Sequence, residues 1–81
     1  MARGKRERPR LLGAKLRQIR LNLGYSQSEM VKALKEGNQI DRSIVSGWER
    51  GTREPSLIVL LKYAKIAGIS TDLLIDDSAY L

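Results

Sequence analysis

The first twenty residues carry most of the chain's potential for binding chemistry, because eight of them are basic and only Glu7 is acidic. The basic residues of this segment are Arg3, Lys5, Arg6, Arg8, Arg10, Lys15, Arg17 and Arg20. Residues 70–81 show the opposite balance, with three aspartates and no lysine or arginine. Guanidinium and ammonium groups attract phosphates, so the N-terminal part of the chain is suited to a polyanion. A solvated basic tail would explain the same charge, and charge alone does not decide between the two.

The composition argues against enzymatic and metal chemistry. The chain of 81 residues contains no cysteine and no histidine, which removes disulfides, thiolate metal sites and the usual base at neutral pH. Asp76 and Asp77 are adjacent and would not face one another on a helix, and Ser and Lys residues without a pocket do not indicate a nucleophile. We therefore expect no enzyme, no metal and no cofactor.

Length and hydropathy predict a single small domain. No apolar run approaches the roughly 20 residues that span a bilayer, and the basic start lacks the hydrophobic stretch of a secretion signal. We expect no membrane association and a cytoplasmic location. We also expect a flexible basic arm over residues 1–8, a folded domain over 9–76 and a C-terminal tail over 77–81.

Apolar spacing predicts an amphipathic helix after Pro9. Leu12, Leu16, Ile19 and Leu23 are separated by four, three and four residues, which places them on one helical stripe. Gly24 is suited to end this helix in a left-handed conformation.

A second helix is predicted by a capping box. Ser26 precedes Glu29 by three residues, so each side chain can bond the backbone N–H of the other. Met30, Val31 and Leu34 supply its apolar face, and residues 35–39 have the composition of a turn.

A third helix of about two turns has an inward face made by Ile40, Val45 and Trp48. Asp41 offers an N-cap oxygen and Gly51 follows in the usual C-terminal place. We read Trp48 as a core residue and not as a platform for stacking bases. Because these three residues point inward, the opposite side of the helix is free.

Two more helices complete an all-α fold without strands. Pro55 closes a polar loop, Ser56 caps a fourth helix, and Gly68 ends it. The residues expected to face the core from this helix are Leu57, Leu60, Leu61 and Ala64. Ser70 is expected to cap a last short helix that runs to Ile75. The roles of Tyr25, Tyr63 and Tyr80 stay open.

Five segments in order carry a resemblance to a known family. They are Leu16-Arg-Gln-Ile-Arg20, Gly24-Tyr-Ser-Gln27, Val45-Ser-Gly-Trp-Glu-Arg-Gly51, Pro55-Ser-Leu57 and Gly68-Ile-Ser-Thr-Asp-Leu-Leu74. Together they resemble the Cro and phage-repressor (Xre-like) helix-turn-helix family over about residues 12–75. The resemblance implies the five-helix lambda-repressor-like fold, with the third helix lying in the major groove of DNA.

The resemblance implies that the outward positions of the third helix line or flank base edges. These positions are Arg42, Ser43, Ile44, Ser46 and Gly47. Arg42 is the first candidate because its guanidinium can donate two hydrogen bonds to guanine. Ile44 could cover a thymine methyl group or simply pack beside the turn. Gly47 has no side chain that reads bases, which suggests a shorter set of contacts or a close approach of the backbone.

Other matched residues are implied to bind the DNA backbone or to support the reading helix. The residues expected to contact phosphates are Gln27, Arg50, Thr52 and Arg53. In the family, glutamine at the position of Gln27 also braces the reading helix. Arg20 and Glu49 correspond to a pair that joins the first helix to the third.

The turn before the third helix departs from the family. Five residues separate Leu34 from Ile40, where the family pattern has a single glycine. The second helix could continue by a turn, or the loop could bulge. Val31 stands where the family prefers alanine, which suggests a somewhat different helix crossing.

The resemblance favours a sequence-specific transcriptional regulator, in particular a repressor, that binds double-stranded DNA as a homodimer on a palindromic operator. The arm, with Arg3, Lys5, Arg6 and Arg8, could enter a minor groove or stay disordered. A second hypothesis is an antitoxin or anti-regulator that binds a protein partner through residues 75–81.

Overall fold

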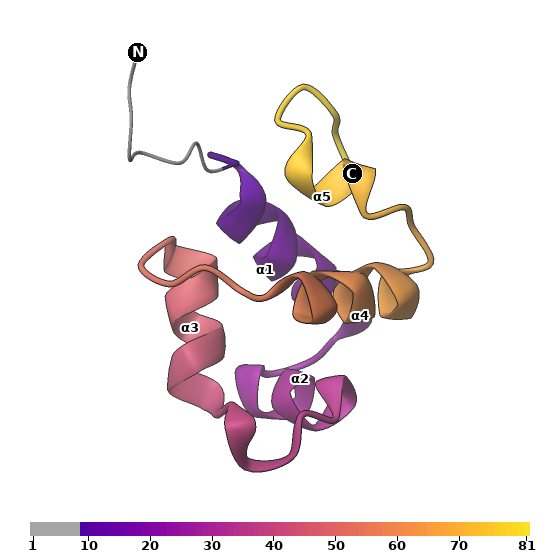
Figure 1. The fold of residues 1–81 in the computed structure, drawn as a ribbon. Coiled ribbons are helices and arrows are strands. Elements are labelled where there is room, and N and C mark those ends of the chain that lie inside the picture. Colours follow the sequence, from indigo (N-terminus) through magenta and orange to yellow (C-terminus); the bar gives the residue numbers. More distant parts are fainter. Residues whose placement is uncertain (1–8) are drawn as a thin grey trace.

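The computed structural model describes residues 9–81, apart from the side chain of Asn38. The described residues form five α-helices and one short 3₁₀ helix, with no strand among them (Figure 1). The elements are α1 (Leu12–Leu23), α2 (Gln27–Leu34), η1 (Gly37–Gln39), α3 (Arg42–Arg50), α4 (Leu57–Ala67) and α5 (Asp72–Ile75). The predicted five-helix architecture is confirmed. The arm residues Arg3, Lys5, Arg6 and Arg8 lie outside the described part of the chain.

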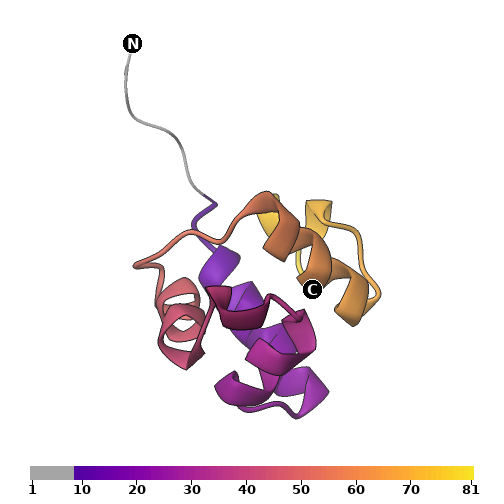
Figure 2. The same cartoon turned by 60° about the horizontal axis from the view of Figure 1, so that its bottom comes forward.

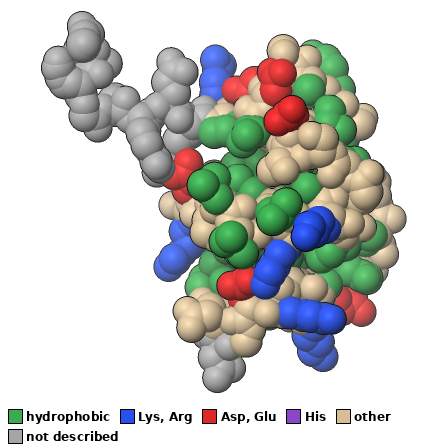
Figure 3. Space-filling model, turned by 45° about the vertical axis from the view of Figure 1, so that its right-hand side comes forward, with side chains coloured by type: hydrophobic (Ala, Val, Ile, Leu, Met, Phe, Trp, Pro, Cys, Tyr) green, Lys and Arg blue, Asp and Glu red, His purple; other side chains and the backbone are tan. Residues whose placement is uncertain are grey.

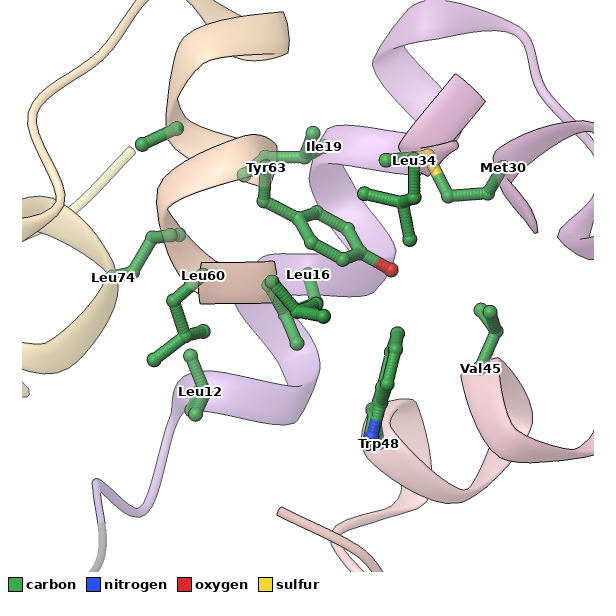
Figure 4. Close-up of a cluster of buried hydrophobic side chains, with 12 residues drawn as sticks. Leu12, Leu16, Ile19, Met30, Leu34, Val45, Trp48, Leu60, Tyr63 and Leu74 are labelled. Carbon is green, nitrogen blue, oxygen red and sulfur yellow. The ribbon is translucent and has the colours of Figure 1, made fainter. Parts of the chain in front are cut away.

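One hydrophobic core holds the five helices together, and α1 packs against α3, α4 and α5. Its members are Leu12, Leu16, Ile19, Met30, Leu34, Val45, Trp48, Val59, Leu60, Tyr63, Ala64 and Leu74. In Figure 4 the ring of Tyr63 points from α4 toward Trp48 and Val45 of α3. The rings of Tyr63 and Trp48 meet edge to face, with centroids 6.2 Å apart. The buried side chain of Trp48 therefore anchors α3 to the core.

Local capping sets most helix ends where the sequence predicts them. Ser26 Oγ accepts from the Glu29 N–H at 3.1 Å, and the Glu29 carboxylate accepts from the Ser26 N–H, which completes the capping box. Asp41 and Ser56 cap α3 and α4 by a single contact each, in which the side chain accepts from the backbone N–H three residues later. The last helix differs, because α5 begins at Asp72 and Ser70 lies one position before the N-cap.

The buried face of α4 differs from the prediction. Leu57 and Leu61, expected in the core, are 81% and 41% exposed, whereas Val59 and Tyr63 are buried. Residues 57–61 are all apolar, so periodicity did not distinguish one face from another. The large ring of Tyr63 takes the central position of the core, and this orientation turns Leu57 and Leu61 outward.

The two ends of the described chain are tied together by side chains that cap helices. Lys15 is 6% exposed, and its Nζ donates to the carbonyl oxygens of Leu73 at 2.6 Å and Asp76 at 2.7 Å. The Asp77 carboxylate accepts from the backbone N–H groups of Arg10 at 2.8 Å and Leu11 at 3.0 Å. Lys15 is one of the eight basic residues in the first twenty, but because its ammonium group is used in these contacts it is not part of a surface that could bind a polyanion.

The crossing of α1 and α3 is close because Gly13 has no side chain. A Cβ atom at this position would lie 2.6 Å from the Glu49 carbonyl oxygen and 2.7 Å from that of Trp48. Two helix backbones can approach this closely only where a small residue separates them. The packing of α3 thus depends on a glycine that no motif had marked.

The lengthened turn bulges, and α2 does not continue. The helix ends at Leu34, and Lys35 follows in a left-handed conformation with φ 55°. Helix η1 then leads into Ile40, which packs against the core. An ion pair between Glu36 and Lys62 ties the bulge to α4.

Candidate nucleic-acid interface

Helix α3 lies at the edge of the molecule with one side buried and the other open. Val45 is fully buried and Trp48 is 5% exposed, as their predicted inward positions require. In both views no other element lies outside α3 (Figures 1 and 2). Arg42 and Ser43, in the first turn, are exposed. The helix therefore presents its N-terminal turn on a free surface.

The first turn of α3 is held by Asp41. Its carboxylate accepts from the Ser43 hydroxyl at 2.7 Å and from the Ile44 N–H at 3.0 Å. The Ser43 hydroxyl and then the Ile44 N–H lower the pKa of Asp41 below its ordinary value, because both donate to the charged form. Ser43 uses its proton within the chain and keeps its oxygen lone pairs for an outside donor. Ile44 is half-buried and packs against the core, which favours the packing interpretation of this residue.

Two of the expected reading positions are occupied by contacts within the protein. Gly47 is buried, and a Cβ atom there would lie 2.9 Å from Cδ of Arg53 and 3.3 Å from Oγ1 of Thr52. The expectation that Gly47 faces outward is therefore wrong, because the Arg53 side chain covers it. Ser46 is half-buried, and its hydroxyl accepts from Arg50 Nε at 3.1 Å. Near the end of α3 the open surface is thus made by Arg50 and Arg53.

A hydrogen-bonded network joins α1 and α2 to α3. Arg20 donates from Nε to Glu49 Oε2 at 2.6 Å and from Nη2 to Glu49 Oε1 at 3.0 Å. Gln27, at the start of α2, donates to the same carboxylate at 3.3 Å, and Arg20 Nη1 donates to the Tyr25 carbonyl at 2.9 Å. The hydrogen bond with Glu49 raises the pKa of Arg20 above its ordinary value. The pair that the resemblance implied is present, and Gln27 contacts α3 as expected.

A hollow of about 410 Å³ adjoins the C-terminal end of α3. It lies between the start of α1 and the loop that follows α3, and Arg10, Arg50 and Arg53 contribute to its walls. All three arginines are exposed, so their guanidinium groups can meet an anion there. The contribution of Arg10 was not expected from the sequence, because only the fold brings α1 beside the loop after α3.

Comparison with known proteins decides the family. The model of the Helix-turn-helix family HTH_3 matches residues 16–74, which is most of the chain. The chain belongs to the helix-turn-helix family. The resemblance to Cro and phage repressors is thereby confirmed. Both curated relatives found for the chain are described as HTH-type transcriptional regulators.

Relatives of this helix-turn-helix protein include repressors with solved structures. The HTH-type transcriptional regulator ImmR of Bacillus subtilis is 36% identical over 64 residues, which cover 79% of this chain and 47% of ImmR. The chain thus spans about half the length of this relative. The crystal structure of the P22 c2 repressor with synthetic operator 9T is 28% identical, with a TM-score of 0.70, and the match covers 84% of this chain and 97% of the repressor. The SinR protein, in its complex with SinI protein, is 28% identical with a TM-score of 0.69 over 83% of this chain and 62% of SinR.

The lambda-repressor-like fold of this helix-turn-helix protein is confirmed by these structures. Over residues 9–81, no helix is both long enough and apolar enough to cross a membrane. The same part of the chain holds no cluster of acidic side chains that could bind a metal ion.

Proposed function

We propose that this helix-turn-helix protein is a sequence-specific DNA-binding transcriptional regulator that represses its target and acts in the compartment that holds the DNA, the cytoplasm. The observation that carries the proposal is the exposed first turn of α3 above buried Val45 and Trp48. A major groove accepts one α-helix, whose first turn faces the base edges. The P22 c2 repressor, with a similar fold, is known in complex with an operator.

We propose that Arg42 makes the strongest contact with a base. It is the first residue of α3, it is exposed, and its planar guanidinium can donate to O6 and N7 of one guanine. Ser43 would accept from a base amino group, and Ile44 and Ser46 would flank these contacts. Gly47 has no part in this proposal, because Arg53 covers it.

Phosphate contacts are proposed at both ends of the reading helix. Gln27 lies at the first position of α2, where backbone N–H groups and the helix dipole attract an anion. Helix α3 ends at Arg50, and the loop that follows it contains Thr52 and Arg53. All three residues are exposed. Arg3, Lys5, Arg6 and Arg8 of the N-terminal arm would add sequence-independent contacts. Deleting residues 1–8 should then flatten the slope of log K against log salt by about 0.9 per lost phosphate contact.

A homodimer on an inverted repeat is part of the proposal. One short helix reaches only a few base pairs, which limits both the affinity and the specificity of a single copy. Two copies related by a two-fold axis would place their α3 helices in successive major grooves, about 34 Å apart along the duplex.

The test is selection of bound sequences from random duplex DNA with the wild-type protein and with Arg42→Ala. We expect an inverted repeat from the wild type and loss of preference at one position of each half-site from the variant. Arg17→Ala is the matched control, because Arg17 is an exposed arginine on α1 and should leave the selected sequence unchanged. If the wild-type protein enriches no sequence, the proposal is wrong.

A second candidate function is that of an antitoxin or anti-regulator that acts by binding a protein partner. The observation that favours it is the exposure of apolar side chains near the C-terminus, where Tyr80 is 82% and Ile75 is 43% exposed. SinR, a structural relative, is known in complex with SinI protein. A stoichiometric complex with a second protein, together with sequence-indifferent DNA binding, would favour this candidate.

A further inference from the structure

The turn between α2 and α3 places an extra segment beside the first turn of the reading helix. We define the bulge as residues 35–39, which stand where the family pattern has a single glycine. Figure 1 shows the bulge at the lower end of α3, next to the point where the helix begins. A recognition helix meets base edges with its N-terminal residues. The bulge therefore lies at the end of α3 that would enter the groove.

Ile40 fixes which way the last residue of the bulge faces. Its backbone is extended, with φ −135° and ψ 156°, and its side chain packs against the core. Side chains alternate between opposite sides along extended backbone, so the neighbours of an inward residue point outward. These neighbours are Gln39 and Asp41, and both are exposed. Gln39 therefore lies on the outer side of the chain, two residues before α3 begins to turn.

The Gln39 amide is available to an outside partner. The neighbouring carboxylate of Asp41 is already used, because it accepts from the Ser43 hydroxyl and the Ile44 N–H. In the described part of the chain, the side chain of Gln39 makes no hydrogen bond, and only its backbone N–H does. A carboxamide can donate to N7 of adenine while its oxygen accepts from the N6 amino group. The side chain thus has the chemistry that selects adenine in a major groove.

Contacts at both ends hold the bulge in place. The Gln39 N–H donates to the Glu36 carbonyl at 3.2 Å, and the Glu36 carboxylate pairs with Lys62 of α4. Ile40 ties the other end of the bulge to the core. A side chain that reads a base needs such support, because a loosely held group loses the geometry of its contact. The bulge is therefore able to position Gln39.

The charge around the bulge is suited to DNA. Lys32 and Lys35, near the end of α2, are exposed. Figure 3 shows lysine and arginine side chains gathered on the lower part of the molecule, the end that holds α2 and the bulge in Figure 1. Positive groups there attract phosphates. Glu36, the acidic residue of the bulge, is neutralised by Lys62, so the bulge does not repel the DNA backbone.

Gln39 and Arg42 are close enough to read one continuous site. They are three residues apart, so their Cα atoms lie at most about 11 Å from each other. Because successive base pairs are about 3.4 Å apart, the two residues should read bases within about three base pairs of each other. Gly47, farther along α3, has no side chain for this task and is covered by Arg53. The reading surface is thus displaced toward the N-terminal end of α3.

We infer that Gln39 is a second base-reading residue, which selects an adenine near the base that Arg42 reads. The inference rests on the proposed DNA-binding function and extends its reading surface from α3 into the bulge. It gives the additional residues of the turn a role in specificity, because the contact comes from a segment that the family pattern does not contain.

The experiment is selection of bound sequences from random duplex DNA with the wild-type protein, Gln39→Ala and Gln39→Arg. We expect the wild type to prefer adenine at one position of each half-site. Gln39→Ala should lose this preference and bind the selected site about tenfold more weakly. Gln39→Arg should replace adenine with guanine, because a guanidinium donates to both N7 and O6. A residue that only supported the fold would not change the preferred base.

Gln18→Arg is the matched control, because Gln18 is an exposed glutamine on α1 and the substitution adds the same charge. It should leave the selected sequence unchanged. If Arg42→Ala loses its position while both Gln39 variants select the wild-type sequence, the inference is wrong and the proposed function stands. The same holds if Gln39→Ala weakens binding to all sequences equally, since that result indicates a phosphate contact. A wild-type protein that selects no sequence overturns the proposed function itself.

Discussion

Arg20 of α1 and Glu49 of α3 form a two-pronged ion pair, with distances of 2.6 Å and 3.0 Å between their nitrogen and oxygen atoms. Their side chains are 10% and 4% exposed, so the pair is screened from water. The carboxylate also accepts from Gln27 of α2. The pair therefore fixes the reading helix against the two helices that precede it.

Removing one member of this pair should destabilise the protein more than replacing both. Glu49→Leu leaves the Arg20 guanidinium buried without its counter-charge, and we expect it to lower the free energy of unfolding by about 3 kcal/mol. Arg20→Met combined with Glu49→Leu should recover most of that loss, since apolar groups of similar volume replace the pair. Urea unfolding monitored by circular dichroism measures both. Equal losses in the single and double variants would contradict a buried, mutually dependent pair.

The Tyr63 hydroxyl is buried without a hydrogen-bond partner among the described residues. Tyr63→Phe removes an unsatisfied polar group and keeps the ring against Trp48, so the free energy of unfolding should stay equal or rise by up to about 1 kcal/mol. A substantial loss of stability in urea unfolding would show that the hydroxyl has a partner after all.

Burial raises the pKa of Tyr63 well above its ordinary value of 10.0. The folded state therefore keeps its proton at a pH where the unfolded chain releases it, and stability should fall as the pH rises above about 10. Tyr63→Phe should remove this part of the alkaline loss. Thermal unfolding of both proteins over about one pH unit on either side of that ordinary pKa measures the difference.

Gly13→Ala and Gly47→Ala should have opposite consequences, although both glycines lie inside helices. At Gly13 the new methyl group meets the backbone carbonyls of Glu49 and Trp48, so α1 and α3 must separate, and we expect a loss of about 1–3 kcal/mol in the free energy of unfolding. At Gly47 it meets the flexible side chain of Arg53, which can move. Gly47→Ala should therefore leave stability unchanged or gain up to about 1 kcal/mol from helix propensity. Chemical unfolding of the pair tests this contrast, and equal losses would contradict it.

Asp77 should contribute to stability in a pH-dependent way. The backbone N–H groups of Arg10 and Leu11 donate to its carboxylate and hold its pKa below the ordinary value of 3.8. The contribution is present above that value and is lost as the pH falls through the lower pKa of the folded state. Asp77→Asn should lower the melting temperature at pH 7 and reduce the acid-induced loss seen in the wild type. An unchanged acid profile would contradict the capping role.

The sequence alone determined the number and order of the α-helices and most of their ends. Ser26 with Glu29, Asp41 and Ser56 cap helices through contacts within three residues, and such local contacts follow from the order of residues. The spacing of Val45 and Trp48 was equally decisive, because only one side of α3 is apolar. Because this spacing turns Val45 and Trp48 inward, it also predicts that Arg42 is exposed.

Tertiary structure decided the features that depend on elements far apart in the chain. Residues 57–61 are all apolar, so only the fit of Tyr63 into the core selected which side of α4 is buried. The positions of Lys15 and Gly13 follow from contacts more than thirty residues away along the chain. Arg53 covers Gly47 because the chain turns back after α3, and helix periodicity contains no information about that turn.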